Sequence, residues 1–249
     1  MVASVQGELQ TTGQPAVGPA TTLPRFRRVL AVGAHPDDES FGLGAILSTL
    51  TEQGTQTSVL SFTHGEASTL GDSLSLHDVR ARELTEAAGE LGSRGVHLLA
   101  YQDGRLATLP IEQLADVVHS LAAEKQVDAL LVFDLGGITG HPDHCCATQA
   151  ALVAADRLGV PVLAWAIPDT AASQLNAEFG PGFLGRRTQD MDFAVKVDRR
   201  RQRSAIARHA SQSSDNPVLW RRLELLGDTE WLRYLRPPAA QQIERNKLT

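Results

Sequence analysis

The stretch "VLAVGAHPDDESFGLG", from Val29 to Gly44, places an apolar run directly before a cluster of acids. The run has the composition of a buried strand, and a histidine, a proline and three carboxylates, Asp37, Asp38 and Glu39, follow it. Carboxylates this close oppose one another's ionisation unless cations or hydrogen-bond donors compensate them. The stretch therefore predicts a strand whose carboxyl end lies beside a positive charge.

Outward from this stretch, short β-rich runs alternate with segments of helical periodicity. This alternation is typical of a parallel sheet covered by helices. We predict strands over 28–34, 56–63, 95–101, 128–134, 161–167 and 192–197, and helices over 42–53, 76–92, 111–125 and 143–158. The predicted fold is α/β, a three-layer, Rossmann-like fold with a mostly parallel sheet and helices on both faces. From residue 199 onward we expect further helices on the same core.

Length and composition predict one domain. The chain has 249 residues, 42% of them hydrophobic, which is enough for one large α/β domain. Residues 1–24 are rich in Gly, Pro, Thr and Gln and lack the basic start and apolar core of a signal peptide, so we expect a flexible tail there and a single domain over 25–249. The loops over 65–78 and 168–191 are expected to form a mobile lid.

Charge and cysteine usage exclude several classes of function. The formal net charge is −6 and the pI is near 5.7, which gives no electrostatic footprint for nucleic acid. The basic run over 199–203 is interpreted as a solvated helix face. No apolar run approaches the length that spans a bilayer. Cys145 and Cys146 are adjacent, so they predict no disulfide framework; we expect them to pack as small buried residues in a cytoplasmic protein.

Parallel strands joined by right-handed crossovers bring their carboxyl ends to one edge of the sheet, where ligands bind. The opening stretch, "FTHGE" over 62–66, "YQDG" over 101–104 and "FDLGGITGHPDH" over 133–144 are therefore expected to meet. His64, in the second of these segments, is expected to be a solvated loop residue.

Two His-Pro-Asp motifs carry the chemistry. His35 and Asp38 are three residues apart across Pro36, and His141 and His144 are three apart across Pro142. Proline suits the first turn of a helix, where residues i and i+3 share a face. Two imidazoles and a carboxylate form the three-ligand set of a catalytic zinc site, with a position left for water. The residues alone leave open which second-motif histidine is the third ligand.

A divalent cation answers the charge problem of the opening stretch. Asp38 is then a ligand, Asp37 is free to act as the base beside the bound water, and Glu39 supports the site, orienting a ligating histidine.

These residues resemble the PIG-L (LmbE-like) family of zinc-dependent N-acetyl deacetylases. The resemblance rests on "AHPDDE" over 34–39 and "GHPDH" over 140–144, and extends through "TxGEA" over 63–67, the helix pattern over 80–92, "YxDGxL" over 101–106 and "ARHASQ" over 207–212. It implies an enzyme that hydrolyses the amide of a small N-acetylated amino sugar or sugar conjugate. It also implies Zn2+, with Fe2+ as another divalent candidate, and assigns the roles of five residues: His35, Asp38 and His144 as ligands, Asp37 as general base and His141 as the second histidine.

The expected mechanism is attack by metal-activated water, with Asp37 taking the proton and a protonated His141 stabilising the oxyanion. Either residue is a candidate to protonate the leaving amine. Thr139 stands two residues before His141, where some relatives carry a tyrosine, so a phenolic donor is not expected here.

Three further residues are candidate substrate contacts: Arg80, Asp103 and Glu66. For Arg80, a surface ion pair with Glu83 is an equal alternative. Asp103 suits a sugar hydroxyl, although Asp-Gly is also a turn signal. His209 is expected to have a structural role.

Other functions were weighed against deacetylation. Two histidines and a carboxylate also describe non-haem iron oxygenases, but the βα alternation does not suit them. A nucleotide-binding module lacks its glycine pattern here, since "GAHPDDESFGLG" over 33–44 contains no GxGxxG. A catalytically inactive scaffold would be expected to lose its base, and Asp37 is present. Homo-oligomerisation stays open.

Overall fold

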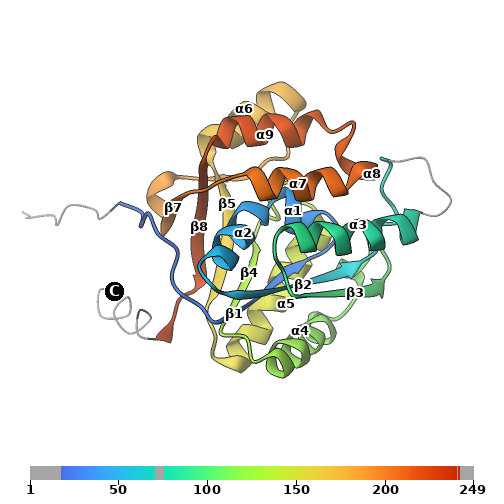
Figure 1. The fold of residues 1–249 in the computed structure, drawn as a ribbon, viewed down its shortest axis with the longest axis vertical. Helices are drawn as coiled ribbons and strands as arrows, with labels where there is room; N and C mark the ends of the chain where they lie inside the picture. Colours follow the sequence, from blue (N-terminus) through green and yellow to red (C-terminus); the bar gives the residue numbers. More distant parts are fainter. Residues whose placement is uncertain (1–17, 71–75, 240, 242–249) are drawn as a thin grey trace, which may run out of the picture.

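The computed structural model describes residues 18–70, 76–239 and 241. Figure 1 shows a central sheet with helices on both sides. The strands are β1 (Arg28–Gly33), β2 (Gln56–Thr63), β3 (Gly95–Tyr101), β4 (Ala129–Phe133), β5 (Val162–Pro168), β6 (Gly185–Arg186), β7 (Phe193–Lys196) and β8 (Thr229–Arg236). The helices are α1 (Asp38–Phe41), α2 (Gly44–Glu52), α3 (Leu76–Glu90), α4 (Ile111–Lys125), α5 (Pro142–Leu158), α6 (Asp169–Phe179), α7 (Arg200–Arg208), α8 (Ala210–Ser213) and α9 (Pro217–Leu226).

The sheet runs in the order β3-β2-β1-β4-β5-β8-β7, and the short β6 pairs with β5. The first five of these strands pair in parallel, whereas β8 is antiparallel to both β5 and β7. β1 lies between β2 and β4, with Val29 opposite Thr57 on one side and Ala129 on the other. The strand order therefore reverses beside β1, which is where open α/β sheets bind ligands.

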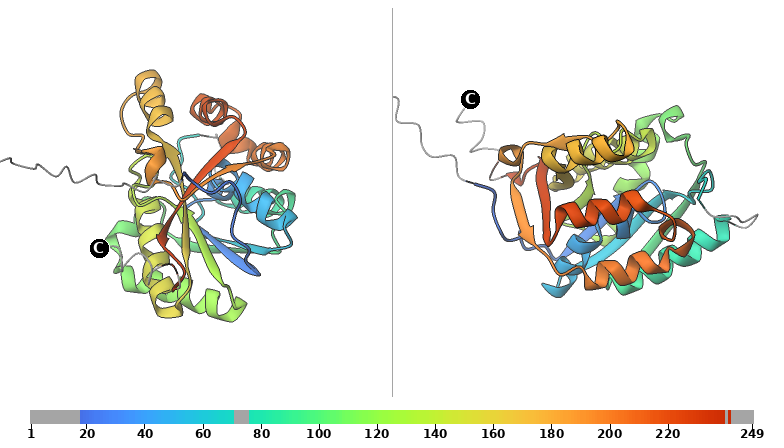
Figure 2. Two further views of the ribbon diagram at one scale, coloured as in Figure 1. Left: turned by 90° about the vertical axis from the view of Figure 1, so that its left-hand side faces the viewer. Right: turned by 90° about the horizontal axis from the view of Figure 1, so that it is seen from above.

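Alternation along the strands produces a core on each face of the sheet. In β1, Val29 and Ala31 join one buried cluster, while Leu30 and Val32 join the other. The second cluster is completed by apolar residues of α4 and α5, and the first by those of α2 and α3. Figure 2 shows the resulting helix–sheet–helix arrangement from two further sides. The predicted three-layer, mostly parallel α/β fold is confirmed.

The C-terminal part of the chain corrects two predictions. Residues 199–226 form the expected helices α7–α9, but the chain then returns as β8 and inserts between β5 and β7. The segment 168–191, predicted as a mobile loop, contains the helix α6, whose Ala171, Ala172 and Leu175 are buried. Figure 1 shows α6 and α9 together above the sheet.

The predicted N-terminal tail lies mostly outside the described residues, and so does part of the predicted loop over 65–78. Within residues 18–24, Ala20 forms a β-bridge with Phe193 and Leu23 is buried in the core. Packed structure thus begins before residue 25. A single domain over 25–249 stays a prediction, which the continuous sheet supports. Among the described residues, no helix has the length and apolarity to cross a membrane.

Candidate metal centre and active site

The first motif lies in the turn that links β1 to α1. α1 begins at Asp38, so Pro36 precedes the helix and does not occupy its first turn as predicted. Asp38 folds back onto the strand end, where its Oδ2 accepts the backbone N–H groups of Ala34 at 2.8 Å and His35 at 3.0 Å. Asp37 lies in this turn, directly before α1. Its φ is 124°, which is in a region that residues with a Cβ rarely adopt. Such strain collects at functional sites.

The second motif follows β4 and begins α5. Pro142 occupies the first helical position, as predicted, and His141 is the N-cap. The His141 Nδ1 accepts the backbone N–H of Asp143 at 3.2 Å, and the His144 Nδ1 faces the carbonyl oxygen of Gly137 at 3.1 Å. Each histidine of this motif therefore has one ring nitrogen held by the backbone and the other directed elsewhere.

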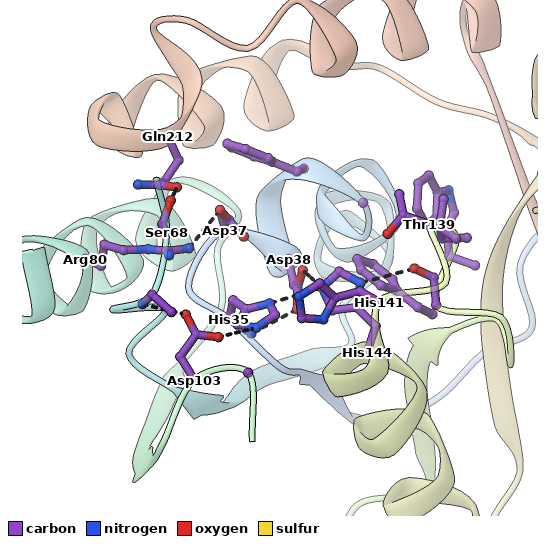
Figure 3. A pocket seen from close by; sticks show the side chains of 18 of the residues that line it. His35, Asp37, Asp38, Ser68, Arg80, Asp103, Thr139, His141, His144 and Gln212 are labelled. Carbon is purple, nitrogen blue, oxygen red and sulfur yellow. Dashed lines mark hydrogen bonds and ion pairs between the residues drawn. The ribbon is translucent and has the colours of Figure 1, made fainter. Parts of the chain in front are cut away.

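Figure 3 shows His35, Asp38, His141 and His144 grouped together in the pocket. The His144 Nε2 lies 3.1 Å from the His35 Nδ1 and 3.1 Å from the Asp38 Oδ1. Ligand atoms bound at about 2.0–2.2 Å around one tetrahedral zinc ion have separations of this order. His141 also comes close, because ring nitrogens of His35, His141 and His144 lie within 4.8 Å of one another.

The proton positions test whether these donors fit a cation. His144 donates Nδ1–H to the Gly137 carbonyl, so its Nε2 lone pair faces the Asp38 carboxylate. The His35 Nε2 lies 2.9 Å from the Asp103 Oδ1, which places its proton there and turns the Nδ1 lone pair toward His144. Three electron-pair donors then face one another. A divalent cation suits this arrangement, and the Gly137 and Asp103 contacts supply the outer support that ligating histidines require.

The pKa shifts indicate the same negative potential. Burial opposes protonation of His35, but Asp103, Asp143 and Asp38 raise its pKa to about 10. Burial also opposes ionisation of Asp38, yet the charge and hydrogen bond of His144 hold its pKa well below the ordinary range. Protons and metal ions compete for the same donor atoms, so a potential that holds protons this firmly also favours a dication.

Asp37 lies in the same pocket beside a buried arginine. The Arg80 Nη2 donates to the Asp37 Oδ2 at 2.9 Å, and the guanidinium also donates to the carbonyls of Pro36 and Gly65. The Arg80 side chain is 3% exposed, which excludes the predicted alternative of a surface ion pair with Glu83. Burial raises the pKa of Asp37 to about 6 although Arg80 opposes the shift. A carboxylate whose pKa is raised toward 7 suits the role of a general base.

Glu39 contacts a different histidine from the one predicted. Its Oε1 accepts from the Nε2 of His209 at 2.6 Å, and its Oε2 accepts the backbone N–H of Asp37 at 3.0 Å. His209 is fully buried, in agreement with a structural role. Glu39 therefore connects the Asp37 turn to the C-terminal helices and does not orient a candidate ligand.

The pocket has a volume of about 340 Å³ and extends to both sides of the histidines. One end is polar, with Ser68, Arg80, Asp103 and Gln212, as Figure 3 shows. Another part of the lining is apolar: Phe133 packs on His144 and Trp165, Gly42 lies against both aromatic rings, and Arg222 lies beside Trp165. Thr139 lies in the wall near His141.

Several predicted residues occupy other places. Glu66 is exposed and accepts the backbone N–H of Asp103 at 2.9 Å, so it braces that loop from outside the pocket lining. His64 stacks on His77 with ring centroids 3.4 Å apart. Cys145 and Cys146 are half-buried, not fully buried as predicted. Arg199, predicted on a solvated face, is buried in an ion pair with Glu230.

A comparison with family models identifies the chain. The model of the family described as "PIG-L: GlcNAc-PI de-N-acetylase" matches residues 30–177, more than half of the sequence. The chain belongs to this family. The matched range contains both His-Pro-Asp motifs, and the family expected from the sequence is confirmed.

Similar proteins support the same assignment. A 1D-myo-inositol 2-acetamido-2-deoxy-alpha-D-glucopyranoside deacetylase from Nakamurella multipartita is 29% identical over 237 residues, covering 74% of this chain and 79% of that protein. The structure of N,N'-diacetylchitobiose deacetylase from Pyrococcus horikoshii matches with a TM-score of 0.63 at 22% identity, over 85% of this chain and 84% of that one. The 4-carboxy-2-hydroxymuconate hydratase GalB from Pseudomonas putida matches with 0.58 at 18% identity, over 86% and 98%. A deacetylase and a hydratase thus share this fold, so structural likeness alone does not determine the reaction.

Sequence reasoning missed three pocket or support residues. Asp143 is the aspartate of the second motif. Its position in the first turn of α5 is the signal from which its burial could have been inferred. Trp165 and Arg222 come from β5 and α9 and carried no motif signal.

Proposed function

We propose that this protein is a divalent-metal-dependent N-deacetylase acting on N-acetylated amino sugars. The observation that carries the proposal is the convergence of the His35 Nδ1, Asp38 Oδ1 and His144 Nε2 in a pocket that also holds Asp37. These atoms would hold the metal. Zn2+ is the proposed ion, because two imidazoles and one carboxylate are a common catalytic zinc set, and Fe2+ is the alternative.

A divalent cation held there supplies Lewis acidity, which polarises an amide carbonyl and lowers the pKa of water. Asp37 accepts the proton of the attacking water. Arg80 fixes one of its carboxylate oxygens, Oδ2, and leaves Oδ1 for this transfer. The strained turn that presents Asp37 is consistent with a base held in one orientation.

His141 is proposed to stabilise the oxyanion as a neutral donor, which revises the expectation of a protonated imidazole. Burial lowers the pKa of His141 below its ordinary value. Its Nδ1 accepts from Asp143, so the neutral ring carries its proton on Nε2 and still donates. A neutral His141 has no proton to give away, and Asp37 therefore returns its proton to the leaving amine.

The polar end of the pocket supports an amino sugar as the substrate. Asp103, Ser68 and Gln212 place polar side chains in the lining beside the proposed ligands. The relatives named above are a deacetylase of an acetamido-glucopyranoside and a deacetylase of diacetylchitobiose. An inactive scaffold would not need a base held in place as Asp37 is held by Arg80, and the acidic groups beside it do not suit a nucleotide phosphate. Both alternatives are therefore less well supported than a deacetylase.

The test combines metal analysis with an assay for released amine. The purified protein is stripped with a chelator, reloaded with Zn2+ or Fe2+, and incubated with N-acetylglucosamine, diacetylchitobiose and an N-acetylglucosaminyl inositol. We expect one metal ion per chain and metal-dependent release of free amine. His35→Ala should lose the metal while folded, whereas the control His119→Ala, on α4 away from the pocket, should keep it. A folded, metal-replete protein that releases no amine from any N-acetylated sugar would contradict the proposal.

A further inference from the structure

Three arginines lie in or near the pocket, and two of them have acid partners. Arg80 pairs with Asp37, and Arg199 pairs with Glu230. Arg222, on α9, lines the pocket and donates to the carbonyl oxygen of Phe41 at 2.7 Å. No Asp or Glu in the described part of the chain forms an ion pair with Arg222.

The surroundings of Arg222 remove water, and the described acids nearest to it, Glu230, Asp37 and Asp38, act on it through their charges without forming an ion pair. Its guanidinium carbon lies 5.2 Å from the centre of the Trp165 ring, and its Nε is buried with no hydrogen-bond partner among the described residues. Burial lowers the pKa of Arg222 to about 10, so it is still a cation at neutral pH. A desolvated cation without an acid is costly, and such a group is best explained by a ligand that completes it.

The acid on the far side of Trp165 is already committed. Glu230 accepts from the Trp165 Nε1 at 2.6 Å through one oxygen and pairs with Arg199 through the other. Glu230 therefore fixes the indole ring and Arg199, and among the described residues it forms no ion pair with Arg222.

An aromatic wall joins Arg222 to the proposed metal ligands. The ring of Phe133 lies 5.0 Å from that of His144 and 5.4 Å from that of Trp165, centre to centre. Gly42 passes directly against these rings, because a Cβ there would lie 2.3 Å from Phe133 and 3.0 Å from Trp165. A substrate group that extends from the donor atoms along this wall would contact the rings of Phe133 and Trp165 first. It would then reach the guanidinium of Arg222.

We propose that Arg222 binds an anionic group, a carboxylate or a phosphate, which the substrate carries along this wall. The inference rests on the proposed function in one respect, that the scissile amide lies at the His35, Asp38 and His144 donors. The planar guanidinium matches two oxygens of such a group, and stacking on Trp165 holds its plane. The anion has two sources: the acyl group itself, or a substituent on the sugar.

Two pairs of compounds distinguish these sources. N-succinylglucosamine is compared with N-butyrylglucosamine, which has the same number of acyl carbons and a methyl group in place of the carboxylate. In the second pair, an N-acetylglucosamine phosphate, either the 6- or the 1-isomer, is compared with N-acetylglucosamine. For each pair, kcat/KM gives a ratio of anionic over neutral substrate, and we expect one pair to show a ratio well above one in the wild-type protein.

Arg222→Gln should lower that ratio by roughly 10–100-fold, the size of a lost charged hydrogen bond, and Arg222→Lys should restore part of it. Arg221→Gln is the matched control, because Arg221 is the next residue but pairs with Glu178 and Glu224 outside the pocket. Its ratio should equal that of the wild type. Because each ratio is internal to one variant, a general loss of activity through the Phe41 contact cancels.

The outcomes are separable from those of the deacetylase proposal. A ratio near one in the wild type for both pairs, or a ratio unchanged in Arg222→Gln, would overturn the role of Arg222. If the wild type hydrolyses none of the compounds, the proposed function fails, and calorimetric binding of the same pairs then decides the inference alone. Tighter binding of the anionic member, lost in Arg222→Gln and kept in Arg221→Gln, supports it; equal binding of both members overturns it.

Discussion

The third residue of the first His-Pro-Asp motif is Asp37, and the third residue of the second is Asp143. The Asp37 side chain is 16% exposed and lines the pocket, whereas Asp143 is fully buried beneath it. Burial raises the pKa of Asp37. Burial acts on Asp143 in the same direction, but His35 and two backbone N–H groups overcome it and lower its pKa.

Backbone geometry causes this difference. Pro142 begins α5, so Asp143 lies in a regular first turn and accepts the backbone N–H groups of Gly104 and Leu106. Pro36 lies ahead of α1, so Asp37 falls in a strained link and has a guanidinium as partner. The same His-Pro-Asp sequence therefore presents its aspartate as a candidate base in the first turn and as a buried hydrogen-bond acceptor in the second.

The largest expected effect separates these roles in catalysis. Asp37→Asn keeps an acceptor for Arg80 but removes the base, so turnover should fall by roughly 10²–10⁴-fold while metal content is unchanged. Steady-state release of amine by metal-replete protein measures it, with Asp116→Asn on the exposed side of α4 as the control. Retention of more than about a tenth of the wild-type turnover would remove Asp37 from the proton transfer.

The next effect concerns metal affinity. Asp143→Asn weakens the support behind His35 and turns an amide NH2 toward a backbone donor. We expect affinity for the metal to fall about 10–100-fold and the free energy of unfolding to fall by about 1–3 kcal/mol. Chelator competition and urea unfolding measure the two quantities. Wild-type metal affinity in Asp143→Asn would show that His35 is positioned without this carboxylate.

The smallest effect tests the backbone itself. At position 37, glycine should be more stable than alanine by about 1 kcal/mol, because only glycine adopts φ 124° without strain. At position 143 the order should reverse, since glycine inside a helix is weaker than alanine by about 0.5–1 kcal/mol. Urea midpoints of the four variants, measured at one metal concentration, check both signs. The same order at both positions would mean that the two turns do not differ as described.

The sequence predicted the parallel part of the fold because its strands are short β-rich runs, most of them largely apolar. β8 does not show this pattern: its buried residues are Glu230, Leu232 and Tyr234, and Arg233 and Arg236 stand three residues apart, a spacing that suits an exposed helix face. The sequence of α6 predicts a loop because the buried face of this helix consists of two alanines and one leucine. Small buried residues give a weak helical period.

Within the site, the sequence predicted which residues meet but not how they are held. The motifs brought His35, Asp38 and His144 to one edge of the sheet, as found. The strain at Asp37 was not predictable, because φ above zero there is imposed by Glu39 and Arg80, which contact it from either side. Arg222 reaches the pocket from a helix that follows the matched family range, so no local pattern marked it.

The four-residue helix α1 cannot complete its own hydrogen bonding. The carbonyl oxygens of Ser40 and Phe41 accept from the Gln202 side chain, and Phe41 accepts also from Arg222. An isolated helix this short is unstable. During synthesis both His-Pro-Asp motifs leave the ribosome long before residue 222 does, so the nascent chain carries every metal-ligand candidate while α1 is still without its caps. The final architecture of the site therefore depends on segments that are made late, α7 and α9, and truncations ahead of α9 should leave the Phe41 carbonyl without Arg222 and the acids of the α1 turn misplaced.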